Sequence, residues 1–249
     1  MKNFKAVVAY DGSRYKGFRK LKGKSDRTIQ AKLENILSKL YEEQVEVISA
    51  INTDAAVHAK YQVVSFKTPS DEHNADKIHN YMETFLPDDI IIINVEEVDE
   101  RFHARYNVTT LTYEYHLWKS NAKQRPLFER NYVKLMDKAL NVIVMEEAAN
   151  RMIGEQDYRA FTSNSKVKNP VKNVKDVKIC ETDNEIVITI SANGFLLNME
   201  RIMVGTLIQV GLYERDVESV DKAFSTLDTT NAGHKAMAGA LCLVDVTYD

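Results

Sequence analysis

The chain has few cysteines, prolines and glycines: two, four and nine among 249 residues. So few cysteines exclude a small fold built on disulfides. Neither Cys180 nor Cys242 has a cysteine or histidine partner at zinc-ligand spacing, and we expect both to be reduced thiols in the core. The low proline and glycine content, with 44% hydrophobic and 28% charged residues, excludes a collagen-like or disordered chain.

Long apolar runs are missing as well. No stretch approaches the roughly 20 apolar residues of a membrane-spanning helix. The first five residues, Met-Lys-Asn-Phe-Lys, lack the apolar core and cleavage site of a signal peptide. We therefore expect a cytoplasmic globular protein with no membrane partner, of one large domain or two ordinary ones.

The sequence also lacks an excess of positive charge, since its formal net charge is −3. Proteins that bind RNA usually carry excess Lys and Arg, so such a function would require local clusters of cations. One candidate is the segment 14–24, which includes Arg14, Arg19 and Lys20 and combines six cations with two aromatic residues. An ordinary solvated surface loop explains the same pattern.

Strand-like and helix-like segments follow one another in a similar order in the two halves of the chain. In the first half we predict strands at 4–10, 44–51, 61–68, 90–98 and 109–119, and helices at about 28–40, with Asp26 or Thr28 as N-cap, and 74–85. In the second half we predict helices at 136–152 and 195–212, strands at 174–181, 186–192 and 240–248, and a short helix before the last strand. Many strand connections are too short for crossovers, so we predict two α+β halves with largely antiparallel sheets, joined near 120–130.

The segment Asn52-Thr53-Asp54 lies between two predicted strands, where a loop can present a side chain at the edge of a rigid sheet. Taken alone, Asp54 is more typical of an Asx turn than of a catalyst. His58 alone is more typical of a structural histidine, because no second His at i+2 or i+4 completes a metal site. A small-molecule hydrolase that uses Asp54 and His58 as a pair is a further interpretation.

A series of motifs along nearly the whole chain favours a functional interpretation of Asp54 over a structural one. They lie at 10–18, 28–34, 52–59, 86–90, 102–106, 113–115, 195–205, 232–234 and 241–246. In this order they resemble the TruA family of tRNA pseudouridine synthases. The resemblance implies an isomerase that breaks the bond between uracil N1 and the ribose, turns the base and rejoins it through C5.

The resemblance also implies roles for individual residues. Asp54 would be the essential aspartate, acting as a nucleophile or as a general base. Arg201 would hold it ionised, because a desolvated carboxylate needs a nearby cation and a guanidinium can bind it through two hydrogen bonds. Tyr113 would stack on the target uracil. In isolation, Arg201 could equally be a surface residue of an amphipathic helix and Tyr113 an ordinary strand aromatic. The candidate substrate-binding residues are Tyr113, His58, Asn52, Arg14, Arg19, Lys20 and Arg105.

The fold implied by the resemblance consists of two ferredoxin-like or RRM-like halves that form a continuous mixed, mainly antiparallel sheet. Helices would cover one face, and the active-site cleft would lie between the halves. Residues 1–120 would form the domain with the catalytic Asp loop, and residues 121–249 the domain with the supporting Arg helix. Members are homodimers that modify uridines 38–40 in the anticodon stem-loop of tRNA, with no metal or small-molecule cofactor.

The sequence departs from the family close to the chemistry. Asn52 replaces an arginine that helps to extrude the base, and Ala56 replaces a glycine. Arg19 and Leu21 replace a Gln-x-Gln pair, and Glu200 adds a negative charge beside Arg201. The alternative is therefore a weak or inactive paralogue that acts as an RNA-binding protein or tRNA chaperone, or that has a different RNA target.

Overall fold

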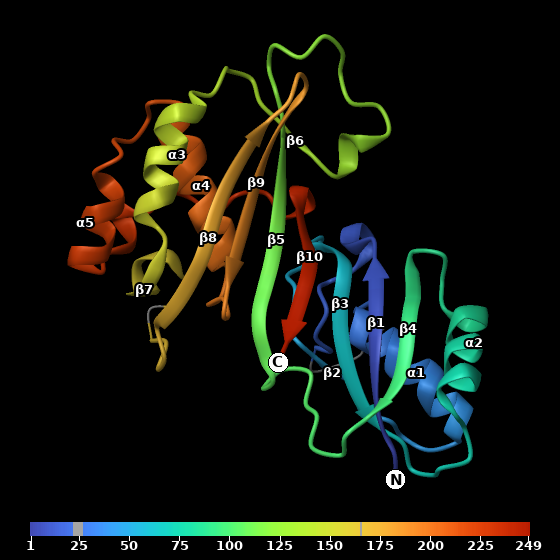
Figure 1. Cartoon of the computed structure of the whole chain (residues 1–249). Helices are drawn as coiled ribbons and strands as arrows, with labels where there is room; N and C mark the ends of the chain where they lie inside the picture. Colours follow the sequence, from blue (N-terminus) through green and yellow to red (C-terminus); the bar gives the residue numbers. More distant parts are fainter. Residues whose placement is uncertain (22–26, 165) are drawn as a thin grey trace. The chain divides into compact units, whose positions relative to one another are not determined.

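The computed structural model describes residues 1–21, 27–164 and 166–249, which form two compact units (Figure 1). Unit 1 contains Met1–Thr109 and Leu243–Asp249, and unit 2 contains Thr110–Cys242. Most of β5 (Val108–Trp118) belongs to unit 2, because β5 pairs along residues 111–118 with β9 (Glu185–Ala192), a strand of that unit.

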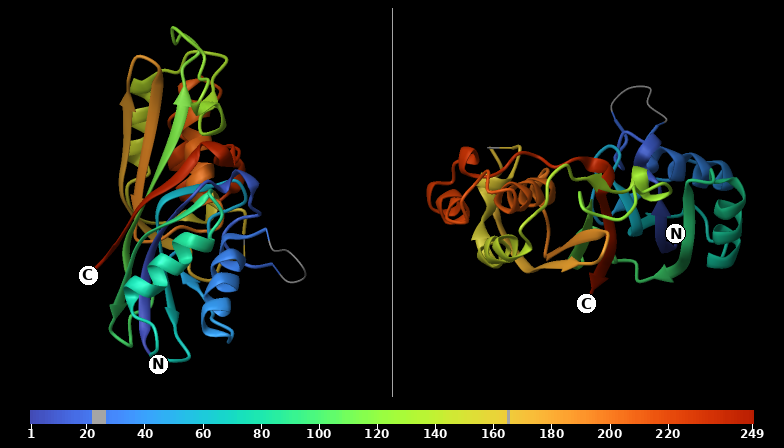
Figure 2. Two further views of the ribbon diagram at one scale, coloured as in Figure 1. Left: turned by 90° about the vertical axis from the view of Figure 1, so that its right-hand side faces the viewer. Right: turned by 90° about the horizontal axis from the view of Figure 1, so that it is seen from above.

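Unit 1 contains two helices and an antiparallel group of strands. Its elements are β1 (Asn3–Tyr10), η1 (Gly12–Arg14), α1 (Ile29–Tyr41), β2 (Ile48–Ser49), β3 (His58–Lys67), α2 (Ala75–Phe85), β4 (Ile90–Val98) and most of β10 (Leu241–Tyr248). The strand order is β4-β1-β3-β10, with β2 beside β3, and β1 is antiparallel to both β3 and β4. Both helices cover the same face of these strands (Figure 2).

The helices of unit 1 begin where capping residues stand. Thr28 accepts a hydrogen bond from Ala31 N–H at the start of α1, whereas the alternative cap, Asp26, lies outside the described residues. The expected strand at 44–51 shrinks to β2. The backbone before β2 bonds to a side chain of α1 instead of to a strand. Val47 N–H donates to Glu34 Oε1 over 3.2 Å.

Unit 2 combines a second group of strands with three helices. Its further elements are η2 (Glu129–Asn131), β6 (Lys134–Leu135), α3 (Val142–Arg151), β7 (Gly154–Asp157), η3 (Tyr158–Phe161), β8 (Val171–Glu181), α4 (Met199–Gly211), α5 (Ser219–Thr226), η4 (Thr229–Asn231) and η5 (Ala238–Ala240). The strand order is β5-β9-β8-β7, and β6 pairs with β5 in parallel. Helices α3 and α4 pack against each other, and α3 covers β8 (Figure 2).

Several predicted boundaries in unit 2 are wrong for local reasons. Helix α3 begins at Val142 rather than 136, because the side chain of Asn141 caps it. Helix α4 begins at Met199 rather than 195, because Asn198 adopts a left-handed backbone with φ of 61°. Cys242 is buried and free as expected, but Cys180 is exposed near the end of β8, so its placement in the core was wrong.

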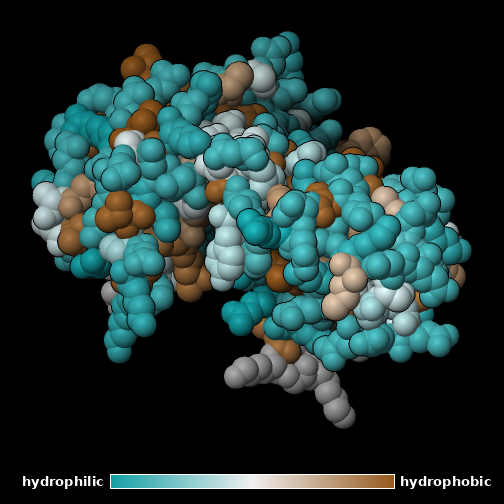
Figure 3. Space-filling model, turned by 60° about the horizontal axis from the view of Figure 1, so that its bottom comes forward, coloured by the Kyte–Doolittle hydropathy of each residue, from teal (hydrophilic) through white to brown (hydrophobic). Residues whose placement is uncertain are grey.

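The α+β class with mixed, mostly antiparallel pairing is confirmed for the ten strands of the described chain. No helix in these residues is long and apolar enough to cross a membrane. The face drawn in Figure 3 is mostly hydrophilic, with apolar residues scattered in small groups.

Candidate active site

The loop that carries Asp54 packs directly on the connection between β1 and α1. A side chain on Gly12 would collide with Val57 O, and a Cβ atom on Gly17 would lie 2.7 Å from Thr53 O. Phe18 N–H donates to the same Thr53 O over 3.0 Å. The motifs at 10–18 and 52–59 are therefore two sides of one packed structure, in which only glycine allows the two backbones to approach so closely.

The turn after Asp54 has a strained residue. Asp54 O accepts a hydrogen bond from Val57 N–H at 3.2 Å, and Ala56 N–H donates to Tyr15 O at 3.3 Å. Ala56 has a φ of 62°, the left-handed region in which a Cβ atom costs roughly 1 to 2 kcal/mol. Position 56, where the family resemblance implies glycine, thus has a positive φ.

Thr53 connects this turn to the core. The hydroxyls of Tyr10 and Thr53 are 2.8 Å apart and buried. Gln62 Nε2 donates to Tyr10 Oη at 3.4 Å and to Ile51 O at 2.9 Å. These bonds hold the backbone beside Asp54, whose own side chain is half-buried.

Asp89, in the motif at 86–90, supports the same loops from the start of β4. Tyr15 Oη donates to Asp89 Oδ1 at 2.5 Å, and Asp11 N–H donates to Asp89 O at 3.0 Å. Burial, and next the hydrogen bond to Asp89, raise the pKa of Tyr15. Tyr15 therefore stays a neutral donor at physiological pH.

His58 is buried, with 5% of its surface exposed. Its Nδ1 lies 3.1 Å from Gly12 N and 3.1 Å from Asp11 Oδ1. Nδ1 can accept the Gly12 N–H when it carries no proton, or donate to Asp11 when it does, but not both at once. Either bond ties β3 to the loop after β1, which is the arrangement of a structural histidine.

The cations of the loop that follows β1 point outward. Arg14 and Arg19 are exposed, and Lys20 Nζ lies 3.3 Å from Glu34 Oε2. The aromatic residues of the loop, Tyr15 and Phe18, are buried and contribute to the core. Two further cations of the expected cluster, Lys22 and Lys24, lie outside the described residues.

Asn52 contacts a cation from another loop. Arg105 Nη2 donates to Asn52 Oδ1 at 3.2 Å and to Ser49 Oγ at 3.4 Å. Unit 1 thus brings Asn52, Asp54, His58 and Arg105 onto two adjoining loops and the start of β3.

Unit 2 places Tyr113 and Tyr115 on one face of β5. Both are buried, and Tyr113 meets Phe195 edge to face, with ring centroids 5.3 Å apart. Burial raises the pKa of Tyr115, and the positive charge of Arg201 partly opposes this rise. Arg201 therefore lies near the tyrosine pair within this unit.

Arg201 is held by the chain segment that follows η4. Its Nε donates to Ala236 O at 2.9 Å, and its Nη1 lies 3.4 Å from Asn198 Oδ1. A side chain on Gly205 would collide with His234 O, so the segment lies directly against α4. The motifs at 195–205 and 232–234 therefore form one support for the guanidinium, and Arg201 is not a free surface residue.

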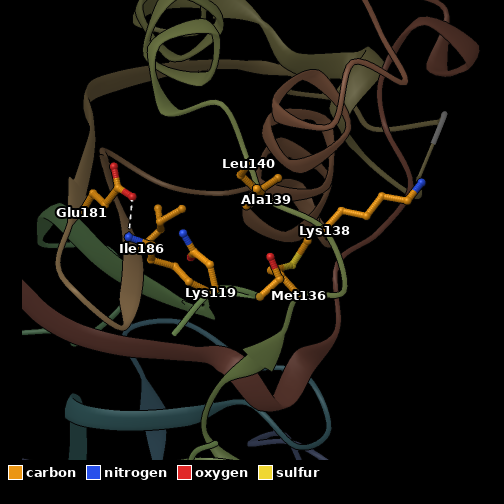
Figure 4. Close-up of a pocket in the computed structure, with 9 residues that line it drawn as sticks. Lys119, Met136, Lys138, Ala139, Leu140, Glu181 and Ile186 are labelled. Carbon is orange, nitrogen blue, oxygen red and sulfur yellow. Dashed lines mark ion pairs between the residues drawn. The ribbon is translucent and has the colours of Figure 1, made fainter. Parts of the chain in front are cut away.

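Two hollows in unit 2 differ in what they can hold. The cavity in Figure 4 measures about 40 Å³, and its wall includes the ion pair between Lys119 Nζ and Glu181 Oε1, at 2.6 Å. That volume holds about one water molecule and excludes a nucleoside. The other hollow measures about 410 Å³. Its lining residues are Ala160, Thr162, Ser163, Ile202, Thr229, Gly233 and Lys235.

The described residues contain no group of three or more His, Cys, Asp or Glu side chains suited to a metal ion. Sequence reasoning missed the supporting roles of Asp89 and Asn198. Asp89 belongs to a quoted motif, but its partners Tyr15 and Asp11 lie more than 70 positions away, so no local pattern connects them.

Comparisons with known proteins agree with these motifs. A family described as tRNA pseudouridine synthase matches residues 6–107 and 148–249. The tRNA pseudouridine synthase A 2 of Bacillus cereus (strain ZK / E33L) is 40% identical over 250 residues, covering 100% of both chains. The tRNA pseudouridine synthase A 1 of Clostridium tetani is 39% identical over 100% of both chains, and the enzyme of Bacillus sp. (strain KSM-64) is 37% identical over 96% of this chain and 97% of its own. The chain therefore belongs to the TruA family of tRNA pseudouridine synthases, isomerases that convert uridine to pseudouridine in tRNA.

Proposed function

We propose that the chain acts on uridines 38–40 of the tRNA anticodon stem-loop, with Asp54 as the catalytic carboxylate. The observation that carries the assignment is the support of the Asp54 loop. Thr53 is bonded to Tyr10, and Gly17 leaves no space behind the turn. A carboxylate presented from such a fixed backbone suits chemistry that depends on accurate placement.

The proposed reaction breaks the bond between N1 of uracil and C1′ of the ribose and forms a bond between C5 and C1′. The hydrogen on C5 leaves to solvent, and N1 gains a proton, so the product is an isomer of the substrate. Asp54 either attacks the sugar or removes a ribose proton, and both roles require its ionised form near the ribose.

Arg201 and Tyr113 have the supporting roles in this proposal. Arg201 keeps Asp54 ionised during the reaction, and its fixation by Ala236 and Asn198 supports this role because a pre-oriented guanidinium loses little freedom on pairing. Tyr113 stacks on the uracil. Its place on a central strand, with Phe195 against the ring, supports a fixed stacking surface.

The finer architecture belongs to the same proposal. We infer two ferredoxin-like or RRM-like halves in one continuous sheet with a cleft for the uridine, a homodimer in the cytoplasm, and tRNA bound by both subunits. The β-α-β-β-α-β order of β1 to β4 supports the first half. Light scattering of the purified chain tests the dimer, and a monomer at the working concentration contradicts it.

Mapping of pseudouridine in cellular tRNA tests the function. Cells with the gene should contain pseudouridine at one or more of positions 38–40, whereas cells without it, or with Asp54→Ala, should contain uridine there. Purified Asp54→Ala should still bind tRNA, which separates loss of chemistry from loss of folding. Wild-type protein that forms no pseudouridine in any tRNA would contradict the proposal and favour the RNA-binding paralogue.

Arg201 has its own test. Arg201→Lys keeps the charge but loses the two-pronged hydrogen bonding, so its kcat should fall less than that of Arg201→Ala. Because Asp54→Ala is itself inactive, the role of Arg201 is measured in chains that keep Asp54, and Arg201→Ala should lower kcat while tRNA binding is unchanged. Equal kcat values for wild type, Arg201→Lys and Arg201→Ala would contradict the role of Arg201.

A further inference from the structure

The loop after β4 presents a cation and an aromatic ring to solvent. Arg105 is exposed, and 80% of the Tyr106 surface is exposed. Large exposed aromatic residues with a cation beside them are typical of nucleic-acid surfaces, where rings stack on bases and guanidinium groups bind phosphates.

This loop is fixed to the body of unit 1. Ala104 is fully buried; its N–H donates to Ser65 Oγ at 3.1 Å, and its carbonyl accepts from Tyr248 Oη at 2.7 Å. Asn3 Nδ2 donates to Phe102 O at 2.9 Å. The two exposed side chains therefore project from a backbone that loses little freedom on binding a ligand.

Arg105 is oriented by neutral groups only. Its Nη2 bonds to Asn52 Oδ1 and Ser49 Oγ, and Ser49 Oγ in turn lies 3.1 Å from Asn52 Oδ1. Within the described parts of the chain, no carboxylate lies within ion-pair distance of Arg105. The guanidinium thus keeps its full charge and has donors left for an anion. Asn52 precedes Asp54 by two residues, which spans at most about 7 Å.

Tyr106 already has a stacking partner on one face. Its ring lies parallel to that of His103, with centroids 4.1 Å apart and an angle of 24°. His103 Nδ1 accepts the backbone N–H groups of Arg105 at 3.2 Å and Tyr106 at 3.3 Å, which fixes the imidazole ring. The stack can therefore be extended by one planar group on the open face of Tyr106.

We infer that His103, Arg105 and Tyr106 form an RNA platform beside the target uridine. Arg105 binds a backbone phosphate within about one nucleotide of that uridine, and Tyr106 stacks on an unpaired neighbouring base. This inference rests on the proposed function for the position of the uridine at Asp54. The combination of an unneutralised guanidinium and an exposed ring favours RNA over a protein partner, because the first binds a phosphate and the second stacks on a base.

The test measures binding of a fluorescein-labelled anticodon stem-loop RNA by anisotropy at several salt concentrations. All variants are made in the Asp54→Ala chain, so that no turnover occurs. Arg105→Gln removes the phosphate contact, and Arg101→Gln is its matched control, because Arg101 is an exposed arginine on the same loop. Tyr106→Ala removes the stacking ring, and Tyr106→Phe keeps it.

Arg105→Gln should weaken binding about 5-fold and lower the slope of log K against log salt by roughly 0.7, the value for one phosphate contact on a single strand. Tyr106→Ala should weaken binding about 5-fold or more without changing the slope. Arg101→Gln and Tyr106→Phe should stay within about twofold of their parent. Thermal unfolding should be unchanged for all four variants, since both side chains are exposed.

Equal RNA affinity for Arg105→Gln, Tyr106→Ala and the control would overturn the platform, and would favour a protein partner for this surface. The outcome of this binding test does not depend on whether the proposed function is correct. Binding is measured without catalysis, whereas the proposed function is lost only if wild-type protein forms no pseudouridine. If the Arg105 and Tyr106 variants weaken RNA binding but the wild-type protein forms no pseudouridine, these residues still bind RNA. Their proposed position beside a target uridine would then be wrong.

Discussion

Gly17→Ala should slow the reaction while the chain stays folded. A Cβ atom at position 17 would lie 2.7 Å from Thr53 O and 3.1 Å from Asp54 C, whereas ordinary contacts begin at 3.4 Å. Relief of the contact with Thr53 O alone, from 2.7 to 3.4 Å, therefore requires a movement of about 0.7 Å. The Phe18 N–H bond to Thr53 O, at 3.0 Å, limits how the loop can move.

The size of the effect follows from this displacement. A misplacement of 1 Å can cost about 100-fold in rate, so a shift of about 0.7 Å should lower kcat roughly 25-fold. Gly17 also has a φ of 97°, and a residue with a Cβ atom in such a conformation loses about 1 to 2 kcal/mol of stability. Folding and catalysis should therefore both change, and the two effects need separate controls.

Gly154→Ala supplies the control. Gly154 has a φ of 113°, but a Cβ atom there would meet nothing within 4 Å. It should lower the free energy of unfolding by a similar amount without changing kcat. The assay is single-turnover release of tritium from tRNA labelled at uracil C5, together with urea unfolding of each variant. A Gly17→Ala protein with wild-type kcat would refute the idea that packing behind the turn positions Asp54.

Three further predictions concern the support of the site. Ala56→Gly should raise the free energy of unfolding by up to about 1 kcal/mol, because relief of the positive φ outweighs the added freedom of glycine in the unfolded chain; an unchanged urea midpoint would contradict this. Asp89→Asn should cost about 1 kcal/mol, because the Tyr15 hydroxyl loses an ionised acceptor, whereas Asp88→Asn, at an exposed position, should cost little in the same urea assay. Burial raises the pKa of Tyr15 and Tyr115 above the value near 10 of the unfolded chain, so the stability that they contribute is complete below pH 10 and falls as the pH rises through that value. The loss for Tyr115 should reach about 1.4 kcal/mol at pH 11, measured by urea unfolding, and Tyr115→Phe should show a smaller loss.

The local sequence pattern was sufficient to predict several helices and strands. The capping side chain of Thr28 and the apolar spacing after it predicted α1, and the strand-like run from Ile90 to Val98 predicted β4 with its observed bounds. The pattern failed at 44–51, where buried valines suggested a strand. Glu34 there provides an acceptor for a backbone N–H that a neighbouring strand would otherwise satisfy. The periodicity of the segment does not show that its backbone hydrogen-bonds to a side chain of the preceding helix.

The candidate site could likewise be predicted from the sequence only in part. Asp54, Tyr113 and Arg201 could be singled out only through the order of the family motifs, since each has an ordinary structural interpretation when taken alone. Their supports were not predicted, because a contact such as Tyr15 to Asp89 joins residues 74 positions apart. The need for glycine behind the Asp54 turn also appears only when the backbone of Thr53 is placed against Gly17.

Asn52 shows why a departure from a family pattern has to be interpreted together with its neighbours in space. From the sequence alone, asparagine in place of the arginine that the family resemblance implies removes a cation two residues before Asp54. In the structure, the side chain of Asn52 binds the guanidinium of Arg105, which comes from a loop 53 positions later. The amide oxygen of Asn52 accepts this hydrogen bond and orients the guanidinium, which an arginine at position 52 could not do because its side chain has donors only. A substitution of Asn52 should therefore be judged by what it does to the guanidinium of Arg105 as well as by the charge that it adds or removes.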